Sequence, residues 1–306
     1  MIWRIKGIVQ KALSVTPGGT RLNDILQLTL GGLRNIDATV DSKVVDDWMV
    51  LARQLRELDV QIQDATLVEV GTGWFPVLPL CFSLGGARTC HTFDVSRHLN
   101  TRLTSRAITR LKVHLAGIAE AAGARIEDVE RRYARLAAAA DAHAALERAG
   151  VRYHAPADAA QTGLPNRSVD AVFSNSVFEH IPGSGIAAIL QETARIVKPD
   201  GVSLHSVNCG DHYSYFDPST TPINYLKYSD RQWRLWNNPL LYQNRLRPID
   251  FVQLAEQAGL EVVSSRFTPK EDLLKVLPTL PVAAQFNRYT PDQLCATSID
   301  FAGRPR

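Results

Sequence analysis

Features that define several specialised protein classes are scarce or missing in this chain of 306 residues. Its few cysteines form no Cys-x-x-Cys pair, which excludes the usual zinc-knuckle and thioredoxin-type motifs. There are four of them, Cys81, Cys90, Cys209 and Cys295. Scattered single cysteines are typical of proteins that work in a reducing compartment.

Membrane and targeting signals are also missing. The sequence has no uninterrupted apolar run of about 18 residues, so we expect no membrane span. Residues 1–11 lack the apolar core of roughly 7–15 residues and the small-residue cleavage site of a secretory leader. These absences lead us to expect a cytoplasmic protein.

Neither sign of charge is in large excess. The 34 basic and 31 acidic residues leave a net charge of +3. Nucleic-acid-binding domains usually carry a clustered and stronger basic excess, so we expect no nucleic-acid partner. Hydrophobic residues make up 45% and charged residues 21%, which is ordinary globular usage and excludes disordered or collagen-like chains.

Short apolar segments alternate with segments of helical periodicity over the middle of the chain. Strands are predicted at 66–71, 88–94, 151–155, 169–174 and 202–207. Helices are predicted at 77–84 and 184–197, and within 101–149, where Gly117 and Gly123 are expected to separate them. This alternation predicts an α/β fold, a Rossmann-like three-layer sandwich with a mostly parallel sheet.

The remaining segments suggest additions to this core. Residues 1–60 contain helical patterns, including an amphipathic one at 42–58, and are predicted to form an N-terminal lid or extension. Residues 61–306 would form the main domain. Residues 208–247, which we call the cap, are rich in aromatic residues and are predicted to cover the site.

A glycine-containing turn follows the first predicted strand, in Glu69-Val-Gly71-Thr-Gly73. Such a turn lets the backbone approach a ligand closely, although alone it would also suit a dinucleotide. The third glycine of a dinucleotide motif falls on Pro76, which lacks the amide that would face a pyrophosphate. Asp94 ends the next strand, where a carboxylate can accept both hydroxyls of a ribose.

The most specific pattern lies further along. Asp158 follows the third predicted strand, Asn175-Ser176 and Glu179-His180-Ile181 follow the fourth, and Lys198-Pro-Asp-Gly201 ends the next helix. Together with the glycine turn, this order resembles the class I S-adenosylmethionine-dependent methyltransferases, in particular the subgroup with a Glu-His-Ile motif. The resemblance covers about residues 66–207.

The resemblance implies S-adenosylmethionine as cofactor and a seven-stranded sheet whose last strand, at 293–301, is antiparallel. It also implies a set of cofactor-binding residues, namely Glu69, Gly71, Gly73, Asp94, Asp158, Asn175 and Ser176. The chain departs from the family at Phe75, where a third glycine is usual. An NAD-linked oxidoreductase and a non-catalytic S-adenosylmethionine-binding module are the alternatives.

Two groups of residues are candidates for catalysis. His180 follows the fourth strand and could act as a base, or it could only orient its loop. Asp211 and His212 follow the fifth strand and could form a base with its orienting acid. The same pair could ligate a metal together with Asp217 or His205, or Asp211 could simply cap a turn. We expect no metal site.

The aromatic residues of the cap are candidates for binding the acceptor, chiefly Tyr213, Tyr215, Trp233 and Trp236. They could instead form a satellite core or a homodimer contact. The expected acceptor is a small molecule or glycan, methylated at a hydroxyl rather than at nitrogen or carbon. The cap and its flanking motifs resemble bacterial methyltransferases of natural-product or polysaccharide pathways.

A row of basic residues shares one predicted helix face, because its members are spaced by four: His98, Arg102, Arg106, Arg110 and His114. This face could attract a phosphorylated acceptor. It could equally be paired with nearby glutamates, for which Glu120, Glu127 and Glu130 are candidates.

Overall fold

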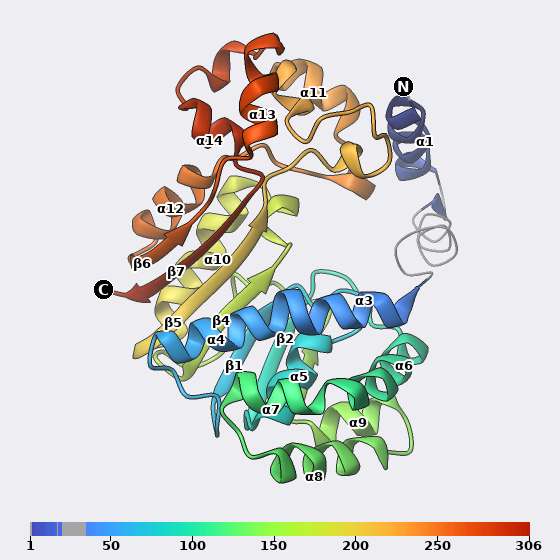
Figure 1. The fold of residues 1–306 in the computed structure, drawn as a ribbon, viewed down its shortest axis with the longest axis vertical. Helices are drawn as coiled ribbons and strands as arrows, with labels where there is room; N and C mark the ends of the chain where they lie inside the picture. Colours follow the sequence, from blue (N-terminus) through green and yellow to red (C-terminus); the bar gives the residue numbers. More distant parts are fainter. Residues whose placement is uncertain (1, 17, 20–34) are drawn as a thin grey trace.

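A seven-stranded sheet forms the centre of the computed structural model, which describes residues 2–16, 18–19 and 35–306 (Figure 1). The strand order is β3-β2-β1-β4-β5-β7-β6. β7 is antiparallel to both of its neighbours, and the pairs among β1 to β5 are parallel. This is the predicted Rossmann-like sheet with an antiparallel last strand.

The first four strands lie close to the predicted ranges, and the fifth begins at Val197, before the predicted start at 202. The strands are β1 (Thr66–Val70), β2 (Thr89–Phe93), β3 (Val151–His154), β4 (Val169–Asn175), β5 (Val197–Asn208), β6 (Leu260–Arg266) and β7 (Ser298–Pro305). The prediction that the last strand spans 293–301 was wrong at its start. Thr290 and Gln293 form a capping box that begins a short helix, α14 (Pro291–Cys295), so the strand starts only at Ser298.

The helices connect and cover these strands. They are α1 (Ile2–Val15), α3 (Ile36–Ser42), α4 (Met49–Glu57), α5 (Val77–Gly85), α6 (Thr101–Leu111), α7 (Leu115–Ala122), α8 (Ile126–Ala137), α9 (Ala142–Arg148), α10 (Gly183–Ile196), α11 (Asp230–Trp236), α12 (Pro248–Gln257) and α13 (Glu271–Val276), besides α14. Gly123 ends α7 in the left-handed region at φ +66°, as the sequence predicts. Gly117 lies inside α7, so the break predicted there was wrong.

Two hydrophobic cores lie on opposite faces of the sheet, because successive side chains of a strand point to opposite faces. Leu67 of β1 packs with α3 to α9, and Val68 packs with α10 and α12. The helix at 36–57 is continuous, with a π-helical stretch η2 (Lys43–Trp48) in its middle. Its Trp48 is fully buried in the first core.

A third apolar cluster lies at one end of the molecule, where α1, α11, α13 and α14 gather (Figure 1). Trp3 of α1 packs against Tyr213 of the cap, with ring centroids 5.0 Å apart. The N-terminal segment predicted as one lid therefore has two placements, because residues 36–57 pack into the core and α1 packs on the cap. Among the described helices, none is both long and apolar enough to cross a bilayer.

The basic face of α6 is ion-paired with α3. The Arg110 guanidinium and the Asp41 carboxylate are 2.7 Å apart, His114 Nε2 lies 2.6 Å from the same carboxylate, and Arg106 pairs with Asp37 at 3.4 Å. Pairing of this basic face with acidic side chains was one of the two predicted outcomes. Its acidic partners lie on α3, however, and not at the glutamates that the sequence suggested.

A fully buried arginine joins the cap to the rest of the chain. Arg247 ends the cap, and its guanidinium donates to the carbonyl oxygens of Cys209 at 2.9 Å and Leu294 at 3.2 Å. It also donates to the carbonyl oxygens of Gln293 and Ala296 and to the Tyr225 hydroxyl. One side chain thus satisfies backbone acceptors at the end of β5 and around α14, which buried acceptors require.

We expect Arg247→Met to lower the free energy of unfolding by at least about 3 kcal/mol, because several buried carbonyls lose their donor at roughly 1–3 kcal/mol each. Urea unfolding followed by circular dichroism measures the change. The control is Arg266→Met, which removes an exposed arginine 3.4 Å from Glu57 and should cost less than about 1 kcal/mol. Equal losses in both variants would contradict the role given to Arg247.

Candidate functional site

The turn after β1 depends on two glycines. Gly71 and Gly73 have φ values of +81° and +69°, in the left-handed region that favours glycine. A Cβ atom added to Gly71 would lie 2.5 Å from Cγ2 of Val177, so the loop after β4 can approach this turn only because residue 71 has no side chain. A Cβ on Gly73 would meet nothing within 4 Å, so the turn faces open space there.

The bulky residue that replaces the family's third glycine lies in the interior. Phe75 is 3% exposed and belongs to the core beneath the sheet. Trp74 is half-buried, and its ring centroid lies 5.7 Å from that of His98. The departure from the family pattern therefore adds core contacts and leaves the glycine turn open.

Asp94 lies at the end of β2, directly beside the glycine turn. Its Oδ2 accepts a hydrogen bond from the amide of Gly73 at 3.1 Å, and its carbonyl accepts one from the amide of Ala157 at 2.8 Å. Burial raises the pKa of the Asp94 carboxyl to about 6, against the opposing effect of His98. Hydrogen bonds thus join the loops after β1, β2 and β3 at one edge of the sheet.

A residue that the sequence analysis missed follows Asp94. Val95 is a large apolar side chain, yet it is 77% exposed at this edge of the sheet. An exposed apolar surface next to a carboxylate matches a ligand with an apolar ring joined to a polar sugar. The only sequence signal for it is its position directly after Asp94.

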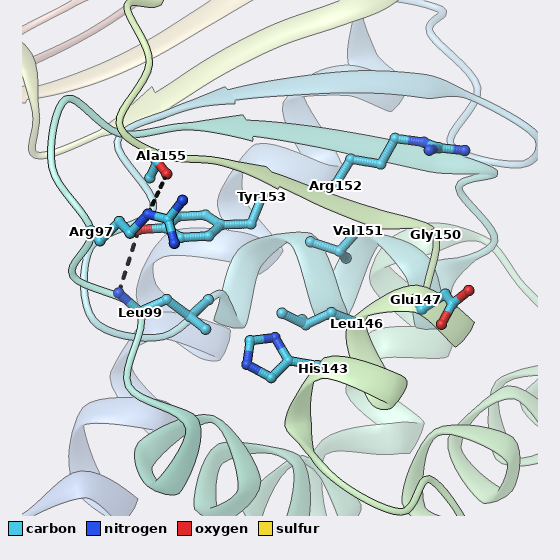
Figure 2. A pocket seen from close by; sticks show the side chains of 10 residues that line it. All are labelled: Arg97, Leu99, His143, Leu146, Glu147, Gly150, Val151, Arg152, Tyr153 and Ala155. Atoms are coloured by element: carbon cyan, nitrogen blue, oxygen red, sulfur yellow. Dashed lines mark hydrogen bonds between the residues drawn. The ribbon is translucent and has the colours of Figure 1, made fainter.

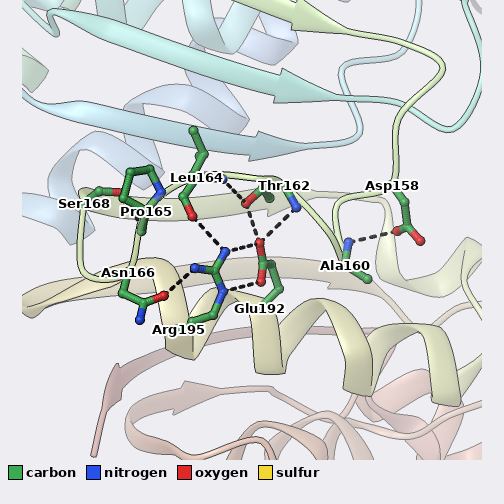
Figure 3. A network of polar contacts seen from close by, with 9 residues as sticks. All are labelled: Asp158, Ala160, Thr162, Leu164, Pro165, Asn166, Ser168, Glu192 and Arg195. Carbon is green, nitrogen blue, oxygen red and sulfur yellow. Dashed lines mark hydrogen bonds and ion pairs between the residues drawn. The ribbon is translucent and has the colours of Figure 1, made fainter.

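Asp158 lies on the loop after β3 and is exposed. Its Oδ1 accepts a hydrogen bond from the amide of Ala160 at 2.8 Å (Figure 3). The same loop is fixed to α10, because Glu192 accepts from the amide of Thr162 at 2.9 Å and Arg195 donates to the carbonyl of Leu164 at 2.9 Å. This network holds the loop that carries Asp158.

Glu69 lies within β1 and is buried. Its Oε2 accepts a hydrogen bond from the Thr92 hydroxyl at 2.8 Å. Burial raises the pKa of the Glu69 carboxyl to about 8, although Thr92 and Lys43 act in the opposite direction. Lys43 comes from η2, so this helix places a positive charge near the first strand.

A polar cavity of about 350 Å³ lies at the carboxyl ends of β4 and β5. It is lined by three residues from the sequence prediction, Asn175, Ser176 and Tyr215, of which Tyr215 is 64% exposed. Asp47 of η2 and Lys270 also line it, and the sequence pattern gave no signal for either. Burial raises the pKa of the Asp47 carboxyl, against the attraction of Lys43 and a hydrogen bond from Asn175.

The two candidate histidines meet beside this cavity. The ring centroids of His180 and His212 are 5.0 Å apart, and His212 lies 5.5 Å from the ring of Tyr215. His180 Nδ1 lies 2.8 Å from the carbonyl oxygen of Tyr242. Desolvation by the surrounding protein lowers the pKa of both histidines, to about 3 for the buried His212, so both are neutral at pH 7.

Asp211 does not pair with His212. The Asp211 side chain is fully buried and accepts hydrogen bonds from the amide of Tyr213 at 2.9 Å and from Asn224 at 3.1 Å. It caps the short helix η5 (His212–Tyr215), which was one of the alternatives in the sequence analysis. The prediction that Asp211 orients His212 as a base is therefore corrected. The ring of His212 lies next to that of His180 instead. The other suggested metal ligands form hydrogen bonds elsewhere. Asp217 accepts one from the Ser219 hydroxyl, and Nδ1 of His205 is hydrogen-bonded to the Ser174 hydroxyl.

The aromatic residues of the cap have two different environments. Tyr213 and Trp233 are 2% and 5% exposed and belong to the third apolar cluster, which was the alternative interpretation. Trp236 is half-buried, and its carbonyl accepts from the Tyr213 hydroxyl at 2.7 Å. Of the four aromatic candidates, Tyr215 is the one that lines the polar cavity.

A larger cavity, of about 540 Å³, lies along β3 at the edge of the sheet. Figure 2 shows Arg97 and Tyr153 on one side of it and His143 and Leu146 of α9 on the other. None of the predicted site residues lines it. Volume alone therefore does not identify the site. The smaller, polar cavity is the one that predicted site residues line.

Comparison with protein families agrees with this geometry. A family described as methyltransferase domain matches residues 49–265, more than half of the chain. The chain therefore belongs to this family. It is an S-adenosylmethionine-dependent methyltransferase, and S-adenosylmethionine is its methyl donor. The alternative of an NAD-linked oxidoreductase is thereby removed. No curated protein matches the chain.

Several solved structures are similar to the chain. A S-adenosylmethionine-dependent methyltransferase from Mesorhizobium loti is 13% identical, with 82% of this chain and 95% of that one covered and a TM-score of 0.42. Geranyl diphosphate C-methyltransferase from Streptomyces coelicolor A3(2) is 12% identical, with 88% and 83% covered and a TM-score of 0.46. Similarity at this level carries no information on the acceptor.

We expect Asp94→Ala to weaken S-adenosylmethionine binding at least tenfold, or about 1.4 kcal/mol, because it removes the buried carboxylate beside the glycine turn. Isothermal titration calorimetry measures the dissociation constant. Asp158→Ala is the comparison, since its exposed carboxylate should contribute less. Unchanged affinity in Asp94→Ala would remove this residue from the cofactor site.

A second prediction concerns pH. The raised pKa of Glu69 means that the folded protein binds a proton that the unfolded chain releases between about pH 4.5 and 8, so stability falls as pH rises through this range. Glu69→Gln should therefore be more stable than the natural protein at pH 8, by a few kcal/mol at roughly 1.4 kcal/mol per pKa unit, and nearly equal to it at pH 4.5.

Urea unfolding at both pH values tests this prediction. The matched control is Glu130→Gln, which removes an exposed carboxylate. A stability difference between Glu69→Gln and the natural protein that does not change with pH would contradict the argument.

Proposed function

We propose that this methyltransferase transfers the methyl group of S-adenosylmethionine to a hydroxyl of a small molecule or glycan, in a natural-product or polysaccharide pathway. The observation that carries the proposal is the polar cavity beside Asn175 and Ser176, with a pair of neutral histidines next to it. A hydroxyl is the acceptor that gains most from such a pair, because it must lose a proton during the transfer.

The cofactor is expected to lie over the edge where the loops after β1, β2 and β3 meet. The open space at Gly73 fits a ligand in close contact with the backbone, and Asp94 would accept from the ribose hydroxyls. Val95 offers an apolar surface for the adenine ring. Asp158 would lie near the adenine amino group. Glu69 holds a proton at pH 7 in the free protein, and the positive charge of the cofactor would favour loss of that proton.

The acceptor would bind in the polar cavity, which is large enough for a single sugar or aromatic ring. Tyr215 offers an exposed ring against which an acceptor can pack, and Asp47 and Lys270 offer hydrogen bonds. S-adenosylmethionine supplies an already activated methyl group. The protein therefore contributes mainly by holding the hydroxyl in line with that group and by accepting its proton at His180, while His212, a weak base with a pKa of about 3, would orient the hydroxyl.

The proposal is tested by measuring S-adenosylhomocysteine formation with a panel of phenols, sugars and amines, together with the mass of the product. Methylation of a hydroxyl acceptor, with kcat about 10²–10⁴ lower in His180→Ala and His212→Ala, is the expected result. Turnover of amines alone would replace oxygen by nitrogen as the acceptor atom. Cofactor binding without turnover across the whole panel would favour a non-catalytic module.

Tyr215→Ala should raise KM for the acceptor severalfold and leave S-adenosylmethionine affinity unchanged, because the side chain lines the acceptor cavity and lies apart from the glycine turn. The matched control is Phe216→Ala, which removes a neighbouring aromatic ring, 41% exposed, outside that lining. Steady-state kinetics with varied acceptor measures both variants. The same change in KM for both would show that the cavity is not the acceptor site.

A further inference from the structure

A buried carboxylate beside the histidine pair has no adequate partner. Glu179 follows β4 in the short helix η4 (Phe178–His180) and is 1% exposed. Among the described residues, none donates a hydrogen bond of normal geometry to either of its carboxylate oxygens. The backbone amides of Glu179 and Asn208 lie near this side chain. An unpartnered buried carboxylate is costly and requires an explanation.

Two further potential ligands face the same point. Each of Glu179, His180 and His212 offers one ligand atom, and these atoms all lie within 4.8 Å of one another. His212 is 8% exposed, and its Nε2 also has no hydrogen-bond partner in the part of the chain that the structure describes. Two unsatisfied buried groups of complementary type therefore lie together, on loops that follow different strands.

The surroundings of His180 suit a ligand. Its Nδ1 lies 2.8 Å from the Tyr242 carbonyl oxygen, so that Nδ1 carries the hydrogen and Nε2 keeps its lone pair. Metal-binding histidines usually donate their other ring N–H to a carbonyl or carboxylate in this way. His180 is also exposed, which leaves a path by which an ion can enter.

We propose that Glu179, His180 and His212 bind a divalent transition-metal ion of the zinc type. Such an ion would be the positively charged partner that the Glu179 carboxylate lacks among the described residues. It would also accept the lone pair of His212 Nε2. Two imidazoles and one carboxylate suit Zn²⁺, Co²⁺ or Fe²⁺, whereas Mg²⁺ and Ca²⁺ prefer all-oxygen sites. Zinc ligands lie at about 2.1 Å from the ion, so small side-chain rotations would close the site around it.

This inference deepens the proposed function and rests on it for the role of the metal. Three protein ligands leave a fourth position open, and His212 adjoins Tyr215 of the acceptor cavity. An acceptor hydroxyl bound there would lose its proton to water more easily, so with the ion bound the two histidines would act on that proton through the ion and not as free bases. The oxygen would then form its bond to the methyl carbon as the carbon–sulfur bond breaks, which yields the methyl ether, S-adenosylhomocysteine and one released proton.

The experiment is a Zn²⁺ titration of the chelator-stripped full-length protein by calorimetry, with Co²⁺ as an absorption probe. We expect one equivalent of Zn²⁺ per chain, and at least tenfold weaker binding in Glu179→Gln and in His180→Ala. The control, His143→Ala, removes an exposed histidine of α9 and should bind as the natural protein does. Since His180 is exposed, His180→Ala should fold even if a change at buried Glu179 does not.

Absence of Zn²⁺ binding, or equal binding in all variants, would overturn the metal site. S-adenosylmethionine binding and hydroxyl methylation are measured separately on stripped and reloaded protein. A stripped enzyme that methylates at the full rate would overturn the catalytic role of the ion and leave the methyltransferase proposal intact. A chain that binds Zn²⁺ at this site but methylates no hydroxyl would overturn the proposed function and leave the metal site standing.

Discussion

The site depends on the close approach of the loops after β1 and β4 at the carboxyl edge of the sheet. Val177, from the loop after β4, lies where a side chain on residue 71 would be, so only glycine allows the β1 turn and this loop to meet. The same turn donates a hydrogen bond to Asp94. The β4 loop that starts at this contact continues through Glu179 and His180. One missing side chain thus brings the proposed cofactor and acceptor groups to one edge.

Much of this arrangement could be predicted from the sequence, because it follows from strand ends. The short apolar runs and the residues that follow them place Gly71, Asp94 and Asn175 at the carboxyl edge of a parallel sheet. The hydrogen-bond partners of the Asp211 side chain could not be predicted in this way. Its side chain caps η5, and whether a carboxylate caps its own turn or orients a neighbouring imidazole depends on a rotamer that the pattern does not encode.

The aromatic cap shows a second limit of the sequence. Composition predicts a contact surface, but it does not separate Tyr213, which is buried against Trp3, from Tyr215, which is exposed in the cavity. That difference depends on α1, which packs on the cap from more than 200 residues away in the chain. The same holds for Asp47, which reaches the cavity only because the helix at 36–57 crosses the sheet.

The type of acceptor to which Arg247 bonds determines which substitutions around it the cap can tolerate. Apart from one hydroxyl, its hydrogen bonds go to main-chain carbonyls, which any amino acid supplies. The anchor therefore places little demand on the identity of the neighbouring side chains. Substitution of the side chains around Arg247 would therefore leave these hydrogen bonds in place.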